Sequence, residues 1–263
     1  MNDTAEEKMP FTAHLEELRR RLTICAISVG AGFIICYIFS KQLFNLLVAP
    51  LVHALPQGSK LIYTALPEAF FTYLKVAFVA GLLLSTPMIF YQMWKFIAPG
   101  LYANEKKYVI PFVVSSSALF IGGALFGYLV VFPFGFQFFL GYTTDTIQAL
   151  PSLKQYFSFS IKLLIAFGLV FELPIITFFL AKMGVVTAAM MRKQRKIAIV
   201  VIFVAAAIFT PPDVITQLMM AVPLLVLYEI SIIIAKVFGK KKEEAEEEDE
   251  DEQEEESAQV DKG

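Results

Sequence analysis

Six long apolar runs fill most of this 263-residue chain, near residues 22–39, 70–94, 108–134, 156–181, 197–210 and 214–235. A helix needs about 20 apolar residues to cross a hydrocarbon core of about 30 Å, and most of these runs are long enough. The sequence therefore predicts an all-α integral membrane protein, with six transmembrane helices within residues 1–238. Function is expected at the edges and polar interruptions of these runs.

The distribution of charge predicts the orientation of the chain. With the N-terminus in the cytoplasm, only five of the 22 lysines and arginines fall outside: Lys41, Lys60, Lys75, Lys154 and Lys162. The positive-inside rule thus predicts cytoplasmic N- and C-termini, which agrees with an even number of spans. The first twenty residues are polar, and no cleavable signal peptide is visible. Residues 239–263 form a low-complexity acidic segment, for which we expect a disordered cytoplasmic tail.

Two short apolar stretches modify this simple plan. Leu43–Val52 is too short to span and lies in a proline-rich outside segment, which indicates an interfacial cap. The fifth run, Ile197–Thr210, would be a helix of only about 21 Å. Since the turn TPPD at Thr210–Asp213 follows it directly, we expect the last two helices to be short and the bilayer beside them to be thinned.

Glu172 is the most costly residue within the apolar runs, because it lies in the middle of FGLVFELPIITF. An ionised carboxylate there costs roughly 2.5–3.5 kcal/mol on insertion scales. It should therefore face other helices rather than lipid. It is either protonated or in contact with water or a cation, and its role is either a single inter-helix hydrogen bond or a functional one.

The third run carries three consecutive serines, Ser115–Ser117, and glycines at Gly122, Gly123 and Gly127. Small residues let another helix approach closely, so a packing role is the favoured interpretation. Serine ligands for a transported substrate are the alternative.

Motifs for catalysis are absent from the sequence. It contains no G-x-S-x-G, no H-E-x-x-H and no G-x-x-x-x-G-K-[ST]. Cys25 and Cys36 lie too far apart along one helix for a disulfide, and the two histidines fall on opposite sides of the membrane. We therefore expect neither an enzyme nor a metal or other cofactor.

Two carboxylates remain on the cytoplasmic rim, Glu17 in an amphipathic segment before the first span and Glu105 after the second. A carboxylate accepts two parallel hydrogen bonds from a guanidinium, so two of them suit a ligand with two arginines better than one with lysines. Alternatively, Glu17 pairs with Arg21 four residues on and Glu105 with a nearby lysine. Spacing alone favours that simpler interpretation.

Four segments resemble, in order, the signatures of the TatC family, the multispan receptor of the twin-arginine protein translocase. They are HLEELRRRL (His14–Leu22), WKFIAPGLYANEK (Trp94–Lys106), FELP (Phe171–Pro174) and TPPD (Thr210–Asp213). The resemblance extends from residue 14 to about residue 235. It implies a concave, glove-like bundle of six helices in the bacterial inner membrane, without catalytic activity.

The resemblance also implies roles for individual residues. Glu17 and Glu105 would contact the paired arginines of a signal peptide, Leu18 and Arg19 would shape the N-terminal helix, and Phe96 and Pro50 match sensitive positions on the inside loop and the outside cap. Glu172 would line the concave face, and Thr210 and Gln217 would lie where single-span subunits dock. An additional acid, Glu16, leaves open which carboxylate takes which arginine.

The implied partners are twin-arginine signal peptides of folded cargo, TatA- and TatB-type single-span subunits, the lipid bilayer and further copies of the chain within a receptor complex. Nucleic acid is not among them, and the proton gradient would drive export. The alternative function is a proton- or ion-coupled secondary transporter of small molecules that uses Glu172, although no repeat relates the first three runs to the last three. A structural scaffold is a third, weaker possibility.

Overall fold

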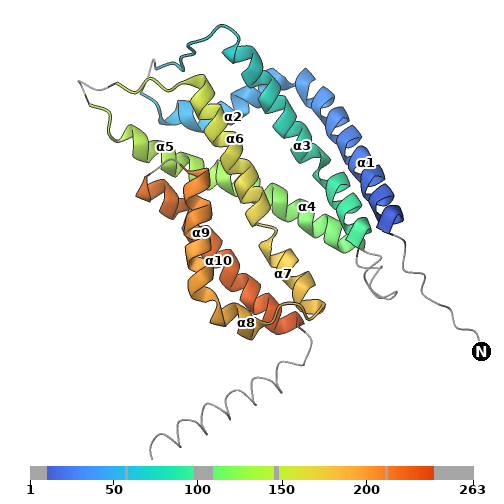
Figure 1. Ribbon diagram of the computed structural model, residues 1–263. Coiled ribbons are helices and arrows are strands. Elements are labelled where there is room, and N and C mark those ends of the chain that lie inside the picture. The colour runs from blue at the N-terminus through green and yellow to red at the C-terminus, as the bar shows by residue number, and fades with distance from the viewer. Residues whose placement is uncertain (1–10, 57–58, 98–108, 145–147, 211–212, 240–263) are drawn as a thin grey trace, which may run out of the picture. The chain divides into compact units, whose positions relative to one another are not determined.

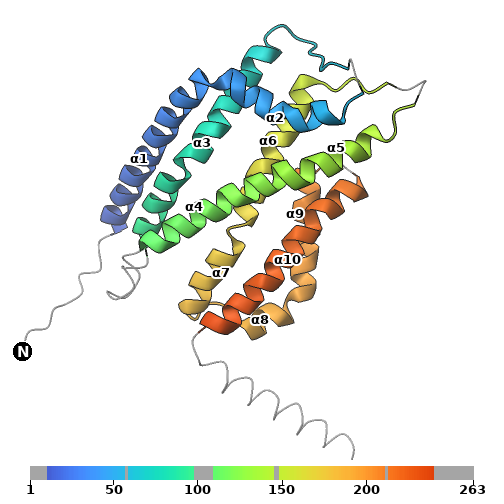
Figure 2. The same cartoon turned by 180° about the vertical axis from the view of Figure 1, so that it is seen from behind.

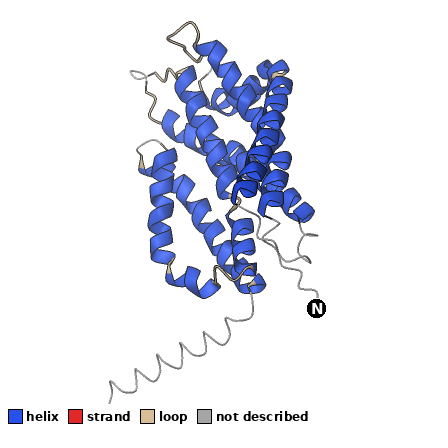
Figure 3. Cartoon of the chain, turned by 45° about the vertical axis from the view of Figure 1, so that its right-hand side comes forward, coloured by secondary structure: helices blue, strands red, loops and turns tan. Residues whose placement is uncertain are grey.

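The described residues of the computed structural model, 11–56, 59–97, 109–144, 148–210 and 213–239, are almost entirely helical (Figures 1 and 3). One isolated parallel bridge, between Ile62 and Ser152, is their only extended pairing. The helices are α1 (Phe11–Ile38), α2 (Ser40–Ala54), α3 (Glu68–Ile97), α4 (Val109–Phe126), α5 (Phe132–Leu140), α6 (Leu153–Val170), α7 (Leu173–Lys182), α8 (Ala188–Lys193), α9 (Arg195–Phe209) and α10 (Val214–Phe238); a π-helical turn, η3 (Gly127–Val131), joins α4 to α5.

Five helical stretches in this part of the chain are long and apolar enough to cross a membrane: His14–Ile38, Glu68–Phe96, Val109–Leu140, Leu153–Lys182 and Val214–Phe238. Each corresponds to one predicted run. The fifth run forms α9, whose 15 residues give a helix of about 22 Å, as short as expected. Six crossings therefore remain a prediction that depends on α9. The predicted tail lies outside the described residues, apart from Gly239.

The prediction that the last two helices are both short is wrong for the final one. Helix α10 has 25 residues, or about 37 Å, and continues through Pro223 and past Lys236. Its polar residues do not shorten it, because they are satisfied locally. Asp213 caps its first turn by accepting a 2.7 Å hydrogen bond from the N–H of Thr216, and the Gln217 amide donates to the carbonyl of Phe203 at 3.0 Å.

The chain divides into two compact units, Met1–Ile121 with Phe132–Ile161, and Gly122–Val131 with Lys162–Gly263. In the first unit, α1 and α3 run side by side (Figures 1 and 2). They cross at two glycines: a Cβ on Gly32 would lie 2.6 Å from the carbonyl oxygen of Gly81, and one on Gly81 would lie 2.5 Å from the backbone nitrogen of Phe33. Beside this crossing, the Ser85 hydroxyl donates to the carbonyl of Ser28 at 2.9 Å.

An aromatic cluster packs α2 in the same unit. The ring of Phe44 lies 4.8 Å from that of Tyr73 on α3 and 4.7 Å from that of Phe157 on α6. The Tyr156 hydroxyl donates to the carbonyl of Leu47 at 2.6 Å. Helix α2 is thus anchored by α3 and α6. It has 15 residues, the same number as α9, and its position as an interfacial cap remains a prediction.

In the second unit, α10 packs against α7, α8 and α9 (Figure 2). Small side chains of Ala181, Ala188 and Ala235 surround Ile232 in a buried cluster, and the Tyr228 hydroxyl donates to the carbonyl of Met191 at 2.8 Å. Near the start of this unit, a Cβ on Gly123 would overlap the carbonyl of Phe167 on α6.

The predicted packing role of the third run is therefore confirmed at Gly123 and also at Gly127, where a Cβ would lie 3.1 Å from the Phe167 ring. Gly122 has no such neighbour, since a Cβ there would meet nothing within 4 Å. Of the predicted serines, Ser116 accepts a 3.4 Å hydrogen bond from the indole of Trp94, and Ser117 donates to the carbonyl of Val113 at 2.7 Å. These contacts support packing as their role.

Large apolar side chains remain exposed along the outer helices. In the His14–Ile38 stretch, only 11% of the apolar window is buried. Exposed residues there include Ile27, Ile34 and Ile38. A continuous apolar surface of this kind is stable in contact with lipid and not with water.

Candidate functional site

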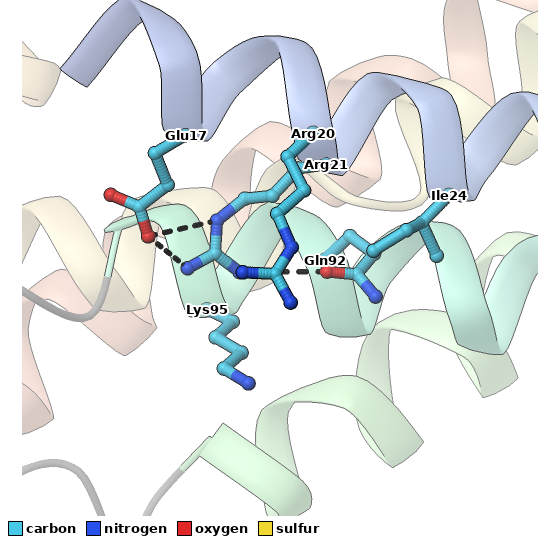
Figure 4. Close-up of a pocket in the computed structure, with 6 residues that line it drawn as sticks. All are labelled: Glu17, Arg20, Arg21, Ile24, Gln92 and Lys95. Atoms are coloured by element: carbon cyan, nitrogen blue, oxygen red, sulfur yellow. Dashed lines mark hydrogen bonds and ion pairs between the residues drawn. The ribbon is translucent and has the colours of Figure 1, made fainter. Parts of the chain in front are cut away.

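A charged pocket lies between α1 and α3 at the N-terminal end of α1 (Figure 4). It has a volume of about 300 Å³ and is lined by Glu17, Arg20, Arg21, Ile24, Gln92 and Lys95. The first four residues lie on successive turns of α1, and the last two lie near the end of α3. With one acid and three bases, the lining carries a net positive charge.

The Glu17 carboxylate is held by Arg21 on the next turn. The Arg21 Nε donates to Oε1 of Glu17 at 3.1 Å, and Nη2 donates to the same oxygen. The third nitrogen, Nη1, lies 3.5 Å from Oε1 of Gln92 on α3. Both charged side chains are largely covered, with 12% of Arg21 and 24% of Glu17 exposed. The Glu17–Arg21 pair that a spacing of four residues predicts is therefore present.

Phe96 lies close to the N-terminal helix. Its ring stacks on His14, with centroids 4.5 Å apart and planes inclined by 24°. His14 of the first signature and Phe96 of the second thus meet, at the same end of α1 and α3 as the charged pocket. Leu18 is half-buried on α1, whereas Arg19 is exposed and its carbonyl accepts a 2.9 Å hydrogen bond from the Thr23 hydroxyl.

Two residues of this region were missed by sequence reasoning, Gln92 and His14. Gln92 is buried although it is polar, and it lies 71 positions from its partner Arg21, so no local pattern could link them. His14 is the first residue of the first signature, and its place there is the sequence feature that could have indicated a role for it. Glu105, the second predicted carboxylate, lies outside the described residues.

Glu172 is buried, with 5% of its surface exposed, as the cost of a carboxylate in lipid predicts. It lies at a break in the fourth run, because α6 ends at Val170 and α7 begins at Leu173. Pro174 falls in the first turn of α7, where a missing N–H does no harm. The buried carboxylate therefore lies where the helix of the fourth run is interrupted.

Polar residues at the end of α9 and the start of α10 bond to the backbone of α9. Thr210 ends α9 and donates its hydroxyl to the carbonyl of Ala206 at 2.9 Å, while Gln217 bridges from α10 to Phe203 on α9. Pro50 lies half-buried inside α2, in the first unit. Among the described residues, no group of three His, Cys, Asp or Glu side chains could hold a metal ion.

Apolar helices of spanning length, with a charged pocket at the end of the first two, define a multi-pass helical membrane protein. The chain belongs to the TatC family, since the family model for the Sec-independent protein translocase protein (TatC) matches residues 13–223. It is thus a multi-pass protein of the bacterial inner membrane and a component of twin-arginine translocation.

Relatives from three bacteria illustrate the similarity. The Sec-independent protein translocase protein TatC of Desulforapulum autotrophicum is 55% identical over 234 residues, covering 89% of this chain and 87% of the relative. The protein of the same name from Magnetococcus marinus is 50% identical, covering 90% and 87%. That of Escherichia coli K12 is 41% identical, covering 70% and 71%.

Two crystal structures of the twin-arginine translocase receptor TatC have the same fold. One is 42% identical, with a TM-score of 0.77 over 85% of this chain and 98% of the other. The second, in DDM, is 41% identical, with a TM-score of 0.76 over 84% and 99%. The relatives are named as translocase components, which are transport proteins rather than enzymes.

Proposed function

We propose that this chain is the receptor that binds twin-arginine signal peptides of folded precursor proteins at the cytoplasmic face of the membrane. The observation that carries the proposal is the Glu17 carboxylate in the charged pocket. It already binds a guanidinium, that of Arg21, through two hydrogen bonds that Oε1 accepts. Two crystal structures of similar chains are of a twin-arginine translocase receptor, which supports the same conclusion.

In this proposal Glu17 binds one arginine of the signal peptide and Glu105 binds the other. Leu18 and Arg19 shape the N-terminal helix around the first arginine. Phe96, stacked on His14, fixes the end of α3 against α1 and so keeps the two signature segments adjacent.

The finer membrane arrangement also belongs to this proposal. The chain crosses the membrane six times with both termini in the cytoplasm, and its helices form a concave, glove-like bundle with Glu172 on the concave face and Pro50 in the periplasmic cap. TatA- and TatB-type single-span subunits dock near Thr210 and Gln217, several copies of the chain share one receptor complex, and the proton gradient drives export. Support comes from the surplus of lysines and arginines on the predicted cytoplasmic side.

The proposal is tested by binding of a synthetic twin-arginine peptide to the full-length chain in lipid nanodiscs. Glu17→Gln removes the charge that holds the guanidinium and should weaken binding at least tenfold, since hydrogen bonds to charged groups contribute about 1.5–3 kcal/mol. Glu105→Gln should do the same.

Glu16→Gln is the matched control, because it removes an exposed carboxylate next to Glu17 that does not line the pocket. Its peptide affinity should change less than twofold, by the small effect of a surface charge. If the Glu16 and Glu17 variants lost peptide affinity equally, Glu17 would contribute only long-range electrostatic attraction. If the Glu17 variant lost no peptide affinity, Glu17 would not be part of the binding site.

A further inference from the structure

We propose that Arg21 is an internal competitor for the arginine of the signal peptide, and that the competition makes the site select arginine over lysine. In the free chain Arg21 occupies Glu17; when the peptide binds, its guanidinium replaces that of Arg21, which moves to Gln92. This inference rests on the proposed function and adds a specificity-determining residue to that site.

The first step is set by the two oxygens of the Glu17 carboxylate. Nε and Nη2 of Arg21 both donate to Oε1. Within the described residues, Oε2 accepts no hydrogen bond, and Figure 4 shows it turned away from Arg21. An incoming guanidinium can therefore bind Oε2 before Arg21 leaves, and the carboxylate is never without a cation during the exchange.

The second step is set by Gln92, which offers Arg21 another partner. Its Oε1 lies 3.5 Å from Nη1 of Arg21, at the outer limit of a hydrogen bond, so a small rotation of the arginine shortens this contact. The Nε2 of Gln92 donates to the Met88 sulfur at 3.9 Å, which keeps the carbonyl side of the amide toward Arg21. Gln92 is 6% exposed and has little freedom to turn away.

Binding of the peptide also brings more positive charge into the pocket, which costs free energy. Arg20 and Lys95 also line it, so a doubly charged peptide meets three cations and one acid. A peptide guanidinium replaces Arg21 with the same planar pair of donors, whereas a lysine ammonium offers a single point of charge and is more strongly hydrated. A lysine peptide therefore displaces Arg21 less effectively, and selectivity arises from the competition as well as from the carboxylate.

The test compares Arg21→Gln with Arg20→Gln in full-length chain in nanodiscs. Both variants remove one positive charge from the pocket, but only Arg21 contacts Glu17. Arg21→Gln should bind a synthetic twin-arginine peptide about three- to tenfold more tightly than the unchanged chain. Its affinity for the twin-lysine peptide should rise by a larger factor, so that the ratio of twin-arginine to twin-lysine affinity falls. Arg20→Gln should raise the affinity for both peptides by the same small factor, so that the ratio of the two affinities stays unchanged.

A second variant tests the alternative partner. Gln92→Leu leaves Arg21 nowhere to move, so it should weaken binding of the twin-arginine peptide when Arg21 is present. In the Arg21→Gln background the same change should have little effect, because no arginine needs a new partner. Coupling between the two positions in this double-mutant cycle would support the exchange.

Several results would overturn the competitor role. If Arg21→Gln bound the twin-arginine peptide more weakly, Arg21 would be a residue that positions Glu17. If its affinity rose no more than that of Arg20→Gln, the effect of Arg21 would be explained by the removal of one positive charge. If the effects of Arg21→Gln and Gln92→Leu on peptide affinity were additive, the proposed movement of Arg21 to Gln92 would be wrong. The proposed function fails separately, if Glu17→Gln leaves binding of the twin-arginine peptide unchanged.

Discussion

Glu68 is a carboxylate whose two oxygens join distant parts of the chain at the start of α3. Oε2 accepts hydrogen bonds from the N–H of Thr64 at 3.1 Å and of Ala65 at 3.4 Å, and Oε1 accepts one from the N–H of Lys154 at 2.7 Å. Next to it, Ile62 exchanges backbone hydrogen bonds with Pro151 and Leu153. The segment before α3 is thereby fastened to the start of α6.

Glu68→Gln should destabilise the protein, because an amide has one accepting oxygen and one donating NH₂ group. Whichever way the amide turns, its NH₂ faces a backbone N–H that has lost its acceptor. We expect the midpoint of thermal unfolding in detergent to fall by several degrees, and proteolysis within residues 59–67 to accelerate.

Lys154→Ala is the matched control for this prediction. It removes a long side chain at the same contact but keeps the backbone N–H that donates a hydrogen bond to Glu68. Its unfolding midpoint should stay near that of the unchanged chain. A fall as large as that of Glu68→Gln would mean that the lysine side chain, and not the backbone contact, is the stabilising group.

Individual residues differ in how far the sequence predicts them. The Glu17–Arg21 pair follows from a spacing of four on a helix. The burial of Glu172 follows from the cost of charge in lipid. The contacts of Gln92 with Arg21 and of Glu68 with Lys154 could not be predicted, because they join positions 71 and 86 residues apart.

Among the helices, α1 and α3 pack closely, and their backbones touch where both have glycine. A side chain at either position would push the helices apart, since the nearest atoms are backbone atoms that cannot rotate away. Close approach of this kind replaces the hydrophobic effect as a source of helix association in lipid. It also places Gln92 and Phe96 of α3 beside Arg21 and His14 of α1.

Gly81→Ala should therefore destabilise the first unit by about 1–3 kcal/mol, the usual cost of an overpacked contact. Unfolding in detergent measures the change directly. Binding of a twin-arginine peptide provides a second readout, which should weaken because the α1–α3 pocket is distorted.

Gly30→Ala is the control on the neighbouring helix, since a Cβ there meets nothing within 4 Å. It should leave stability unchanged or raise it slightly, because alanine is the better helix former. If Gly30→Ala and Gly81→Ala destabilised equally, helix propensity or flexibility would matter more than the crossing.

At the scale of elements, apolar run length predicted where the helices are but not how they are divided. The break between Val170 and Leu173 and the π-helical turn at Gly127–Val131 interrupt runs that read as continuous. The first interruption lies just before Pro174, which has no N–H to continue the hydrogen bonds of the preceding helix. The last run, 214–235, predicts the start of α10, but the helix continues to Phe238.

For the whole molecule, the predicted sixth crossing depends on α9. The other five stretches have the length to span, whereas α9 is about 8 Å shorter than a hydrocarbon core of about 30 Å. If α9 crosses, the lipid beside it must thin or its flanking side chains must extend to the surface. If it does not cross, the two ends of the chain lie on opposite sides, against the distribution of lysine and arginine.

Single cysteines on either side of α9 distinguish these cases. In a background with Cys25→Ala and Cys36→Ala, Lys193→Cys and Val214→Cys introduce exposed thiols just before and just after the helix. We expect a membrane-impermeant maleimide added to intact spheroplasts to label Val214→Cys and to leave Lys193→Cys unlabelled until the membrane is opened. Lys60→Cys, in the outside segment, serves as the accessible control. Labelling of both positions, or of neither, would show that α9 does not cross, and the thinned sixth crossing and the cytoplasmic C-terminus would both have to be abandoned.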